Sequence, residues 1–377
     1  MDFTFTEEQQ AAAEAARGVF AAVAPDAVPS PALVPGAVAE DFDRALWGRL
    51  ADADLLSLLL AEQYGGAGLD AVALCLVLRE SAKVLARVPL LESCAAVAAV
   101  QAYGGPELTA ELLARAGRGE VVLTVAAHGR TGHDPAELAV TARQDGDVWI
   151  LDGVQTAVPW AYDADLVVVP ARTAADRTVL ALVPRGQAGA GLAEQYATSG
   201  ERLGELRLES ARIEARYVID AEGAWEWLRE LLATGTCALA LGLGERVLGM
   251  TSEYASKREQ FGHPIATFQA VAVQAADRYV DLRAMEATMW QAAWRIAAGA
   301  PGALPASGDV AVAKIWASEG VRRIVQTAQH LHGGFGADVD CPLHRYHAWA
   351  KHLELALGPA AAHEEALGDL LAAHPLG

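Results

Sequence analysis

Residues 257–262, KREQFG, carry side chains suited to a ligand that is anionic and partly aromatic. The guanidinium of Arg258 can pair with two phosphate oxygens at once. Phe261 offers an apolar face, and Gln269 in the following ATFQAV offers an amide donor and acceptor. A plainer interpretation is that Arg258 caps the C-terminus of a helix and that Phe261 belongs to a core. On their own, these residues leave a phosphate site and a structural role both open.

A second candidate site is the turn LHGGFG at residues 331–336. Gly333 and Gly334 have no Cβ, so backbone amides there can approach a ligand closely. A simple helix C-cap would use the same glycines. Several histidines surround this turn, but their spacing does not match a metal site, and surface or ligand contacts are expected instead.

The hydrophobic patterning predicts an α+β multi-domain fold in three parts. Residues 1–119 are expected to be helical, with Thr6 as an N-cap and helices in EEQQAAAEAARGVFAAVA, LWGRLADADLLSLLL and AVALCLVLRESAKVLA. Short β-branched runs predict a β-barrel or sandwich domain over 120–222, with a hairpin at Asp145-Gly146. Long helices rich in Ala and Gly predict a four-helix-type bundle over 223–377, whose last two helices are split at Gly358-Pro359.

Composition limits the classes of function. The 377 residues are 53% apolar and 20% charged, as in a well-buried globular protein, and the formal net charge is −19. That charge argues against binding to nucleic acid or to a membrane surface. The four cysteines are far apart, which fits reduced thiols. With no signal peptide and no apolar run of ~18 residues visible, a cytoplasmic protein is expected.

Five strings, taken together and in this order, resemble the acyl-CoA dehydrogenase family. They are FTEEQQ, EQYGGAGLD, DGDVWILDGVQTAVPWAYDADLVVVPART, YASKREQFGHPIATFQAV and LHGGFG, and they extend from one end of the chain to the other. The late stretch CPLHRYHAWAKHLELALG also resembles subunits of the heteromeric dehydrogenases of actinobacterial sterol and bulky acyl-CoA breakdown.

The resemblance implies an FAD shared between subunits of a dimer or tetramer. In this family, the β domain of one subunit holds the flavin ring, and the helical bundle of another reaches the pyrophosphate and adenine. The family removes the α-proton of an acyl-CoA and passes the β-hydrogen to the flavin as hydride; the electrons then leave to an electron-transfer flavoprotein. Carried over to this chain, the expected cofactor-binding residues are Arg258, Phe261, Gln269, His330, Gly333, Gly334 and Thr124.

The part of the sequence that would face the flavin ring departs from the family pattern. Family members carry Thr-Glu-Pro followed by a Gly-Ser-Asp loop, whereas this chain reads LTVAAHGRTGHD. Thr124 is kept, but Val125 and Ala126 replace Glu and Pro. In the second flavin-facing strand, Pro159 replaces a hydrogen-bonding Thr and has no backbone N–H.

The catalytic carboxylate of the family is missing as well. Of its two known locations, the one in the late helical region is Leu357 here, and the one on the first long helix of the bundle falls at about Leu232. Glu230 is two residues away, which is ~200° of rotation on a helix. Glu354 lies three residues before Leu357 on the same helix face. These two acids are the remaining candidates for a base within the chain.

Three hypotheses follow from the missing base. In the first, the chain is one subunit of a heteromeric dehydrogenase, and a paralogous partner supplies the base while this chain supplies Arg258, Gln269 and the Gly333 turn. In the second, the fold serves other acyl-thioester chemistry, such as dehydration, cyclisation or oxygenation, with His128 and His133 of HGRTGHD as titrating groups. In the third, the chain is a non-enzymatic scaffold subunit.

Overall fold

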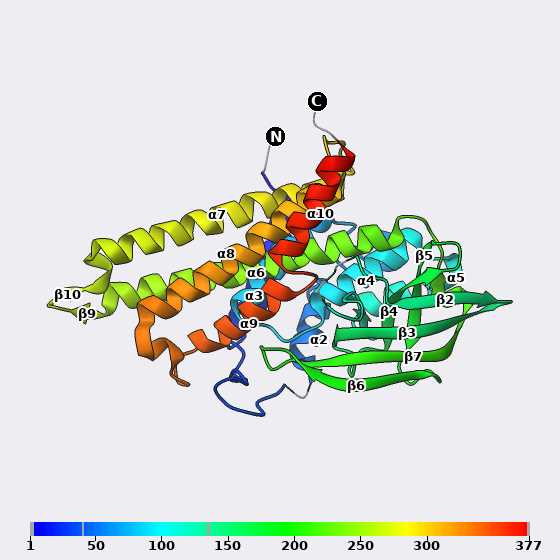
Figure 1. The fold of residues 1–377 in the computed structure, drawn as a ribbon, viewed down its shortest axis with the longest axis horizontal. Helices are drawn as coiled ribbons and strands as arrows, with labels where there is room; N and C mark the ends of the chain where they lie inside the picture. The colour runs from blue at the N-terminus through cyan, green and yellow to red at the C-terminus, as the bar shows by residue number, and fades with distance from the viewer. Residues whose placement is uncertain (1–3, 40, 133, 135, 375–377) are drawn as a thin grey trace.

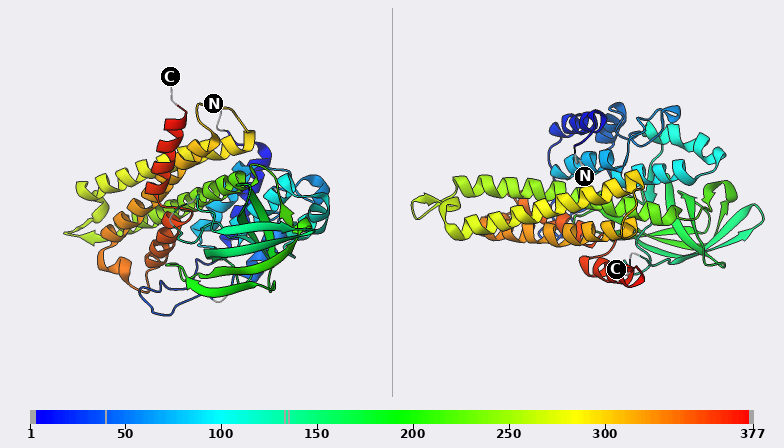
Figure 2. Two further views of the ribbon diagram at one scale, coloured as in Figure 1. Left: turned by 45° about the vertical axis from the view of Figure 1, so that its right-hand side comes forward. Right: turned by 90° about the horizontal axis from the view of Figure 1, so that it is seen from above.

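The computed structural model describes residues 4–39, 41–132, 134 and 136–374, and it confirms the predicted order of helical region, β region and helical bundle. Seen from above, the N-terminal helices lie along one side of the long bundle and α10 along the other, while the sheet lies near one end (Figure 2). The opposite end of the bundle is a narrow tip formed by β9 and β10 (Figure 1). The sheet and the tip are therefore far apart within one chain.

The N-terminal region begins with a helix whose cap matches the prediction. The Thr6 hydroxyl accepts from the Gln9 N–H at 3.2 Å, and the Gln9 Oε1 accepts from the Thr6 N–H at 3.0 Å, which forms a capping box. The helices are α1 (Glu7–Ala21), α2 (Arg44–Asp52), η1 (Glu62–Tyr64), α3 (Ala71–Lys83), α4 (Leu90–Tyr103) and α5 (Pro106–Gly117).

The helix predicted over LWGRLADADLLSLLL is wrong in its second half. Helix α2 ends at Asp52, and Asp54 has a left-handed φ of 56° that stops the helix. The leucines that follow are nevertheless buried, in turns rather than on a helix face. The apolar run of the sequence therefore indicated burial but not helical structure.

The β region forms one eight-stranded mixed sheet in the order β6-β7-β3-β2-β4-β5-β8, with β1 parallel to β4. The predicted hairpin is present, because Asp145 pairs with Val148 across the β2–β3 turn. Strand β6 was not predicted; its side chains alternate between partly buried and exposed and include few β-branched residues. The strands are β1 (Leu123–Val125), β2 (Val140–Asp145), β3 (Val148–Pro159), β4 (Leu166–Thr173), β5 (Thr178–Pro184), β6 (Ala190–Tyr196), β7 (Arg202–Glu214) and β8 (Val218–Ile219).

The C-terminal bundle is built around α6 (Ala224–Lys257), which is long and apolar enough to span a membrane by length and composition alone. Its most apolar window is 78% buried inside the fold, as in the core helix of a soluble protein. The predicted break at Gly358-Pro359 lies between the last two helices. The other elements are η2 (Ala215–Tyr217), β9 (Glu259–Gln260), β10 (His263–Pro264), η3 (Ile265–Thr267), α7 (Gln269–Ala298), α8 (Ala306–His332), η4 (Gly333–Ala337), α9 (Leu343–Leu355) and α10 (Ala360–Ala373).

Candidate functional site

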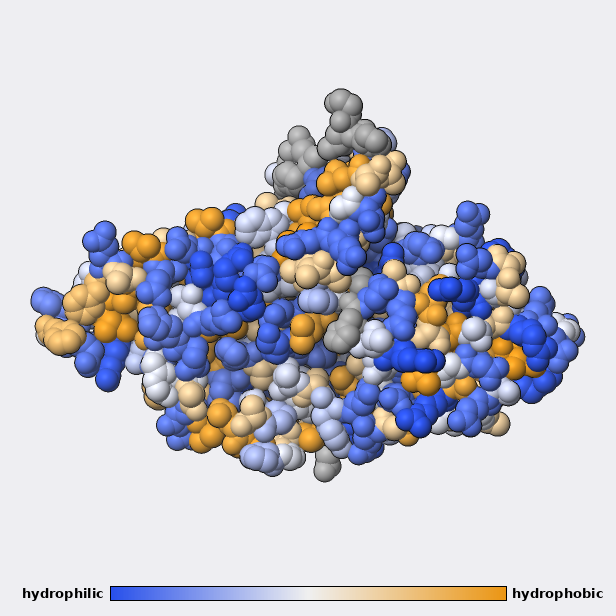
Figure 3. Space-filling model, viewed as in Figure 1, coloured by the Kyte–Doolittle hydropathy of each residue, from blue (hydrophilic) through white to orange (hydrophobic). Residues whose placement is uncertain are grey.

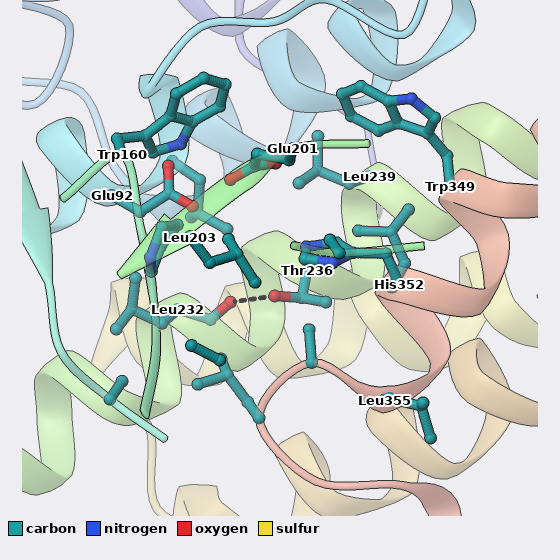
Figure 4. A pocket seen from close by; sticks show the side chains of 18 of the residues that line it. Glu92, Trp160, Glu201, Leu203, Leu232, Thr236, Leu239, Trp349, His352 and Leu355 are labelled. Carbon is teal, nitrogen blue, oxygen red and sulfur yellow. Dashed lines mark hydrogen bonds between the residues drawn. The ribbon is translucent and has the colours of Figure 1, made fainter. Parts of the chain in front are cut away.

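A cavity of about 270 Å³, here called the inner cavity, lies where the sheet meets α4, α6 and α9. Helices α4, α6 and α9 contribute several leucine side chains to its walls (Figure 4). Thr236 adds little polarity, because its hydroxyl donates to the Leu232 carbonyl oxygen at 2.9 Å. The cavity is therefore an apolar chamber between two domains, which is a usual place for a small-molecule site.

Both residues predicted to replace the catalytic base line the inner cavity. Leu232 comes from α6 and is 3% exposed, and Leu357 follows α9 and is 6% exposed. Leu357 has a left-handed φ of 57°, and its N–H donates to the Nε2 atom of His128 at 3.3 Å. Two positions 125 residues apart in the sequence thus face the same chamber, and each presents a hydrocarbon side chain.

Two carboxylates that sequence reasoning missed also line the inner cavity. They are Glu92, in the first turn of α4, and Glu201, just before β7, and they lie close to Trp160 (Figure 4). Burial raises the pKa of Glu92 to about 7, against a smaller effect of the Trp160 indole. Burial and then the charge of Glu92 raise the pKa of Glu201 to about 8. A single acid before the apolar run SCAAVAAV was the only sequence signal for Glu92.

Two imidazoles form another polar part of the inner cavity. Burial lowers the pKa of both His128 and His352 to about 4, so each is neutral at physiological pH. His128 accepts at Nε2, which places its proton on Nδ1, and that atom has no hydrogen-bond partner among the described residues. His133, the second histidine of the HGRTGHD insertion, lies outside the described residues.

The two acids proposed as bases within the chain do not line the inner cavity. Glu230 lines a separate outer groove of about 820 Å³, together with Arg229 and His363. Glu354 forms an ion pair with Lys351, whose Nζ lies 2.7 Å from the carboxylate. Leu357 is shared by the inner cavity and the outer groove, so its side chain lies at the boundary between them.

The remaining predicted contacts lie at the tip of the bundle. Arg258 ends α6, and its side chain is exposed and makes no hydrogen bond or ion pair with any described residue. Phe261 is 91% exposed. Apolar side chains gather on the surface at the tip (Figure 3). Gln269, His330, Gly333 and Gly334 are also exposed.

A groove beside Arg258 carries a stack of aromatic rings. Tyr254 stacks on His332 at 4.3 Å and lies parallel to Phe335 at 5.9 Å between ring centroids. All three rings and Arg258 line this groove of about 380 Å³. Leu232 and Arg258 are 26 residues apart on α6, about 39 Å at ~1.5 Å per residue. No single dinucleotide could contact both the tip and the inner cavity of one chain.

Comparisons with known proteins agree with this geometry. The models for the N-terminal and C-terminal domains of acyl-CoA dehydrogenase match residues 6–120 and 226–371. The acyl-CoA dehydrogenase FadE27 of Mycobacterium tuberculosis is 39% identical over 339 residues, which cover 89% of this chain and 90% of that protein. This chain belongs to the acyl-CoA dehydrogenase family.

Chains of two solved structures are similar to this chain over nearly its whole length. A chain of the ChsE4-ChsE5 complex from Mycobacterium tuberculosis is 37% identical, with a TM-score of 0.89 and full coverage of both chains. A chain of the Tcur3481-Tcur3483 steroid ACAD is 36% identical, with a TM-score of 0.89 and coverage of 97% and 98%.

Members of the acyl-CoA dehydrogenase family bind FAD. In this chain, amides of the loop that would meet the flavin ring are hydrogen-bonded within the loop. The N–H groups of Arg130 and Thr131 each donate to the Glu137 carboxylate at 3.0 Å. The Thr131 hydroxyl donates to the same oxygen at 2.9 Å. The amides that a flavin ring would need as donors are therefore already satisfied by this chain.

Two donors on the strands beside this loop are also bonded within the chain. The hydroxyl of Thr124 is buried and donates to the Pro159 carbonyl oxygen at 2.6 Å, so it does not reach the inner cavity. The N–H of Ala157 donates to the Gln195 side chain at 2.7 Å. Together with two cavity carboxylates, these bonds make a poor fit for a flavin ring. The exposed Arg258 guanidinium and the open glycine turn, by contrast, fit the phosphates and adenosine of a dinucleotide.

Proposed function

We propose that this chain is the base-lacking subunit of a heteromeric acyl-CoA dehydrogenase that desaturates an acyl-CoA thioester between its α and β carbons. A paralogous partner would supply the catalytic carboxylate and the surroundings of the flavin ring. This chain would contribute Arg258 to the pyrophosphate, and Gln269 and the Gly333–Gly334 turn to the rest of the dinucleotide. Bound FAD would accept the hydride, and an electron-transfer flavoprotein would then collect the electrons.

The observation that carries this proposal is the pair of leucines in the inner cavity. An α-proton next to a thioester leaves only to a positioned base, and losing a general base costs ~10²–10⁴-fold in rate. Leu232 and Leu357 both face the chamber, whereas Glu230 and Glu354 do not. The similarity to chains of two complexes named for paired components supports a partner of the same fold.

Flavin content tests the proposal. The chain should be expressed alone and together with the dehydrogenase-like products of neighbouring genes, and FAD per chain should be counted after gel filtration. We expect a stable complex with about one FAD per two chains and acyl-CoA oxidation measured with an artificial electron acceptor. The chain alone should retain little flavin. Full FAD occupancy and vigorous acyl-CoA oxidation by the isolated chain would overturn the proposal.

A second candidate function is supported by Glu92 and Glu201. Carboxyls with a raised pKa are competent general acids or bases near neutral pH, so the inner cavity could itself host acyl-thioester chemistry such as dehydration. Replacing each with glutamine separates the two functions. In a heteromer whose partner holds the base, Glu92→Gln and Glu201→Gln leave the turnover rate within about twofold. A loss of ~10²-fold in either variant would favour chemistry in this chain.

A further inference from the structure

The inner cavity contains a polar group that its apolar walls do not explain. Glu201 is 5% exposed and lines the cavity, yet its Oε1 atom has no hydrogen-bond partner among the described residues. Leaving a buried polar atom unsatisfied costs ~1–3 kcal/mol, and more for a charged group. Because no described residue hydrogen-bonds to this atom, its unpaired state points to a bound molecule as the partner.

Arg87, whose charge acts on Glu201, makes no hydrogen bond to it. Arg87 is buried and holds Asp26 in a two-bonded ion pair, with nitrogen–oxygen distances of 2.9 and 2.7 Å. It also donates to the Ser199 carbonyl oxygen at 2.6 Å. Two of its three nitrogens are thus bonded to neighbouring groups, and its Nη1 is buried without a hydrogen-bond partner among the described residues, so no hydrogen bond joins it to Glu201. The charge of another cavity acid, Glu92, also acts on Glu201.

We propose that the inner cavity binds a neutral, mainly hydrocarbon molecule whose hydroxyl group hydrogen-bonds to Glu201 and Glu92. A hydroxyl is both a donor and an acceptor, so it can accept from a protonated carboxyl and donate to an ionised one. With pKa values of Glu92 and Glu201 raised to about 7 and about 8, one carboxyl can be protonated while the other is ionised, and both line the cavity. The leucine walls from α4, α6 and α9 would enclose the rest of the ligand.

The dimensions and charge of the cavity restrict the ligand further. At about 270 Å³ it is almost twice the size of an engineered apolar cavity of ~150 Å³ that binds benzene. The cavity therefore suits a molecule of about two fused rings. Anionic ligands are disfavoured because any negative charge on Glu201 or Glu92 would repel them. The proposal goes beyond the desaturase function and does not depend on it, since it concerns a chamber that lacks a base in this chain.

Binding of three matched probes tests the chemical class. 2-Naphthol carries the hydroxyl, naphthalene lacks it, and 2-naphthoate replaces it with an anion. Binding to the full chain, in whichever assembly it purifies, should be measured by saturation-transfer NMR and calorimetry. We expect 2-naphthol to bind at least about tenfold more tightly than naphthalene, because a hydrogen bond to a charged group is worth ~1.5–3 kcal/mol. We expect no binding of 2-naphthoate at this site.

Two substitutions then assign the site to Glu201. Glu201→Leu should remove the preference for the hydroxyl while keeping naphthalene binding, and Glu201→Gln should largely keep the preference. Because the leucine variant buries no unpaired polar atom, we expect it to fold at least as stably as the parent, which thermal unfolding verifies. Three results would overturn the proposal: no naphthol binding at millimolar concentration, so that only water fills the cavity; an unchanged preference in Glu201→Leu; or equal binding of 2-naphthoate.

Discussion

The inner cavity and the tip of the bundle differ in how their polar groups are satisfied. Around the cavity, donors are satisfied by acceptors of the same chain. The Glu137 carboxylate accepts from two loop amides, and the Thr124 hydroxyl donates to the Pro159 carbonyl oxygen. At the tip, Arg258 has no partner among the described residues, and Phe261 is almost fully exposed. Under the proposed function, the part of the cofactor site beside the inner cavity is stable without a flavin ring, whereas the tip is available to a dinucleotide shared with a partner subunit.

The difference follows from burial. A buried hydroxyl without a ligand must find an acceptor within the fold, as the Thr124 hydroxyl does at the Pro159 carbonyl oxygen. The loop amides that donate to Glu137 are exposed, so their bonds order the loop without being required by burial. An exposed guanidinium is solvated by water and carries no such penalty. The exposed Arg258 side chain therefore does not destabilise the fold when no ligand is bound. Under the proposed function, it acts only by binding a dinucleotide shared with a partner subunit.

The largest expected effect comes from removing the cation at the tip. In the heteromer, Arg258→Ala should lower FAD affinity and acyl-CoA oxidation by about 10²-fold, because a bidentate phosphate contact is lost. Arg258→Lys should recover part of it, since lysine provides a point charge without the planar fork. Flavin retained after gel filtration and the turnover rate measure the effect.

The neighbouring Lys257 is the matched control. It lies at the same end of α6 and is exposed, but its Nζ is already paired with Glu253 at 2.6 Å. Lys257→Ala should change flavin retention by less than about twofold, as expected for an exposed ion pair. If Arg258→Ala and Lys257→Ala change flavin retention equally, Arg258 does not bind the cofactor. The tip would then not differ from the inner cavity in its role.

A smaller effect is expected from restoring the missing carboxylate. Leu357→Glu puts an acid where the family has one, but the flavin-facing loop stays closed by Glu137, so the isolated chain should gain no acyl-CoA oxidation. The new carboxylate would be buried without a cation and should lower the free energy of unfolding by about 3 kcal/mol. Chemical denaturation and an oxidation assay measure the two outcomes. FAD-dependent turnover in this variant alone would show that the cavity still accepts a flavin.

The sequence predicted the fold better than it predicted the residues of the inner cavity. Helix periodicity, the Thr6 cap and the Asp145-Gly146 turn are local signals, and each reappears in the structure. Leu232 and Leu357 could be found because the positions of the family's catalytic base can be aligned even where the residue type has changed. Glu92 and Glu201 could not be found this way: each is a lone acid, and only the packing of α4 against the sheet makes it a cavity residue.

The smallest expected effect is a pH-dependent gain of stability in Glu201→Gln. The folded chain holds the Glu201 proton up to a pKa of about 8, whereas the unfolded chain releases it near 4.5. The folded state thus binds more protons over this range, so its stability falls as pH rises from 4.5 through 8. Glutamine does not titrate and avoids this loss. The variant should match the parent near pH 4.5 and exceed it by about 2 kcal/mol, or a few degrees in Tm, at pH 8.5.

The buried histidines do not obscure this comparison. The pKa values of His128, His352 and His363 are lowered to about 4, so they destabilise the folded chain as pH falls below 6.5, equally in parent and variant. The difference between the two melting curves therefore reports on Glu201 and on its interaction with Glu92. A difference that is constant from pH 4.5 to 8.5 would mean that this carboxyl is solvated or paired in the folded protein. In that case Glu201 would resemble Arg258 at the tip, because its ionisation would not lower the stability of the fold.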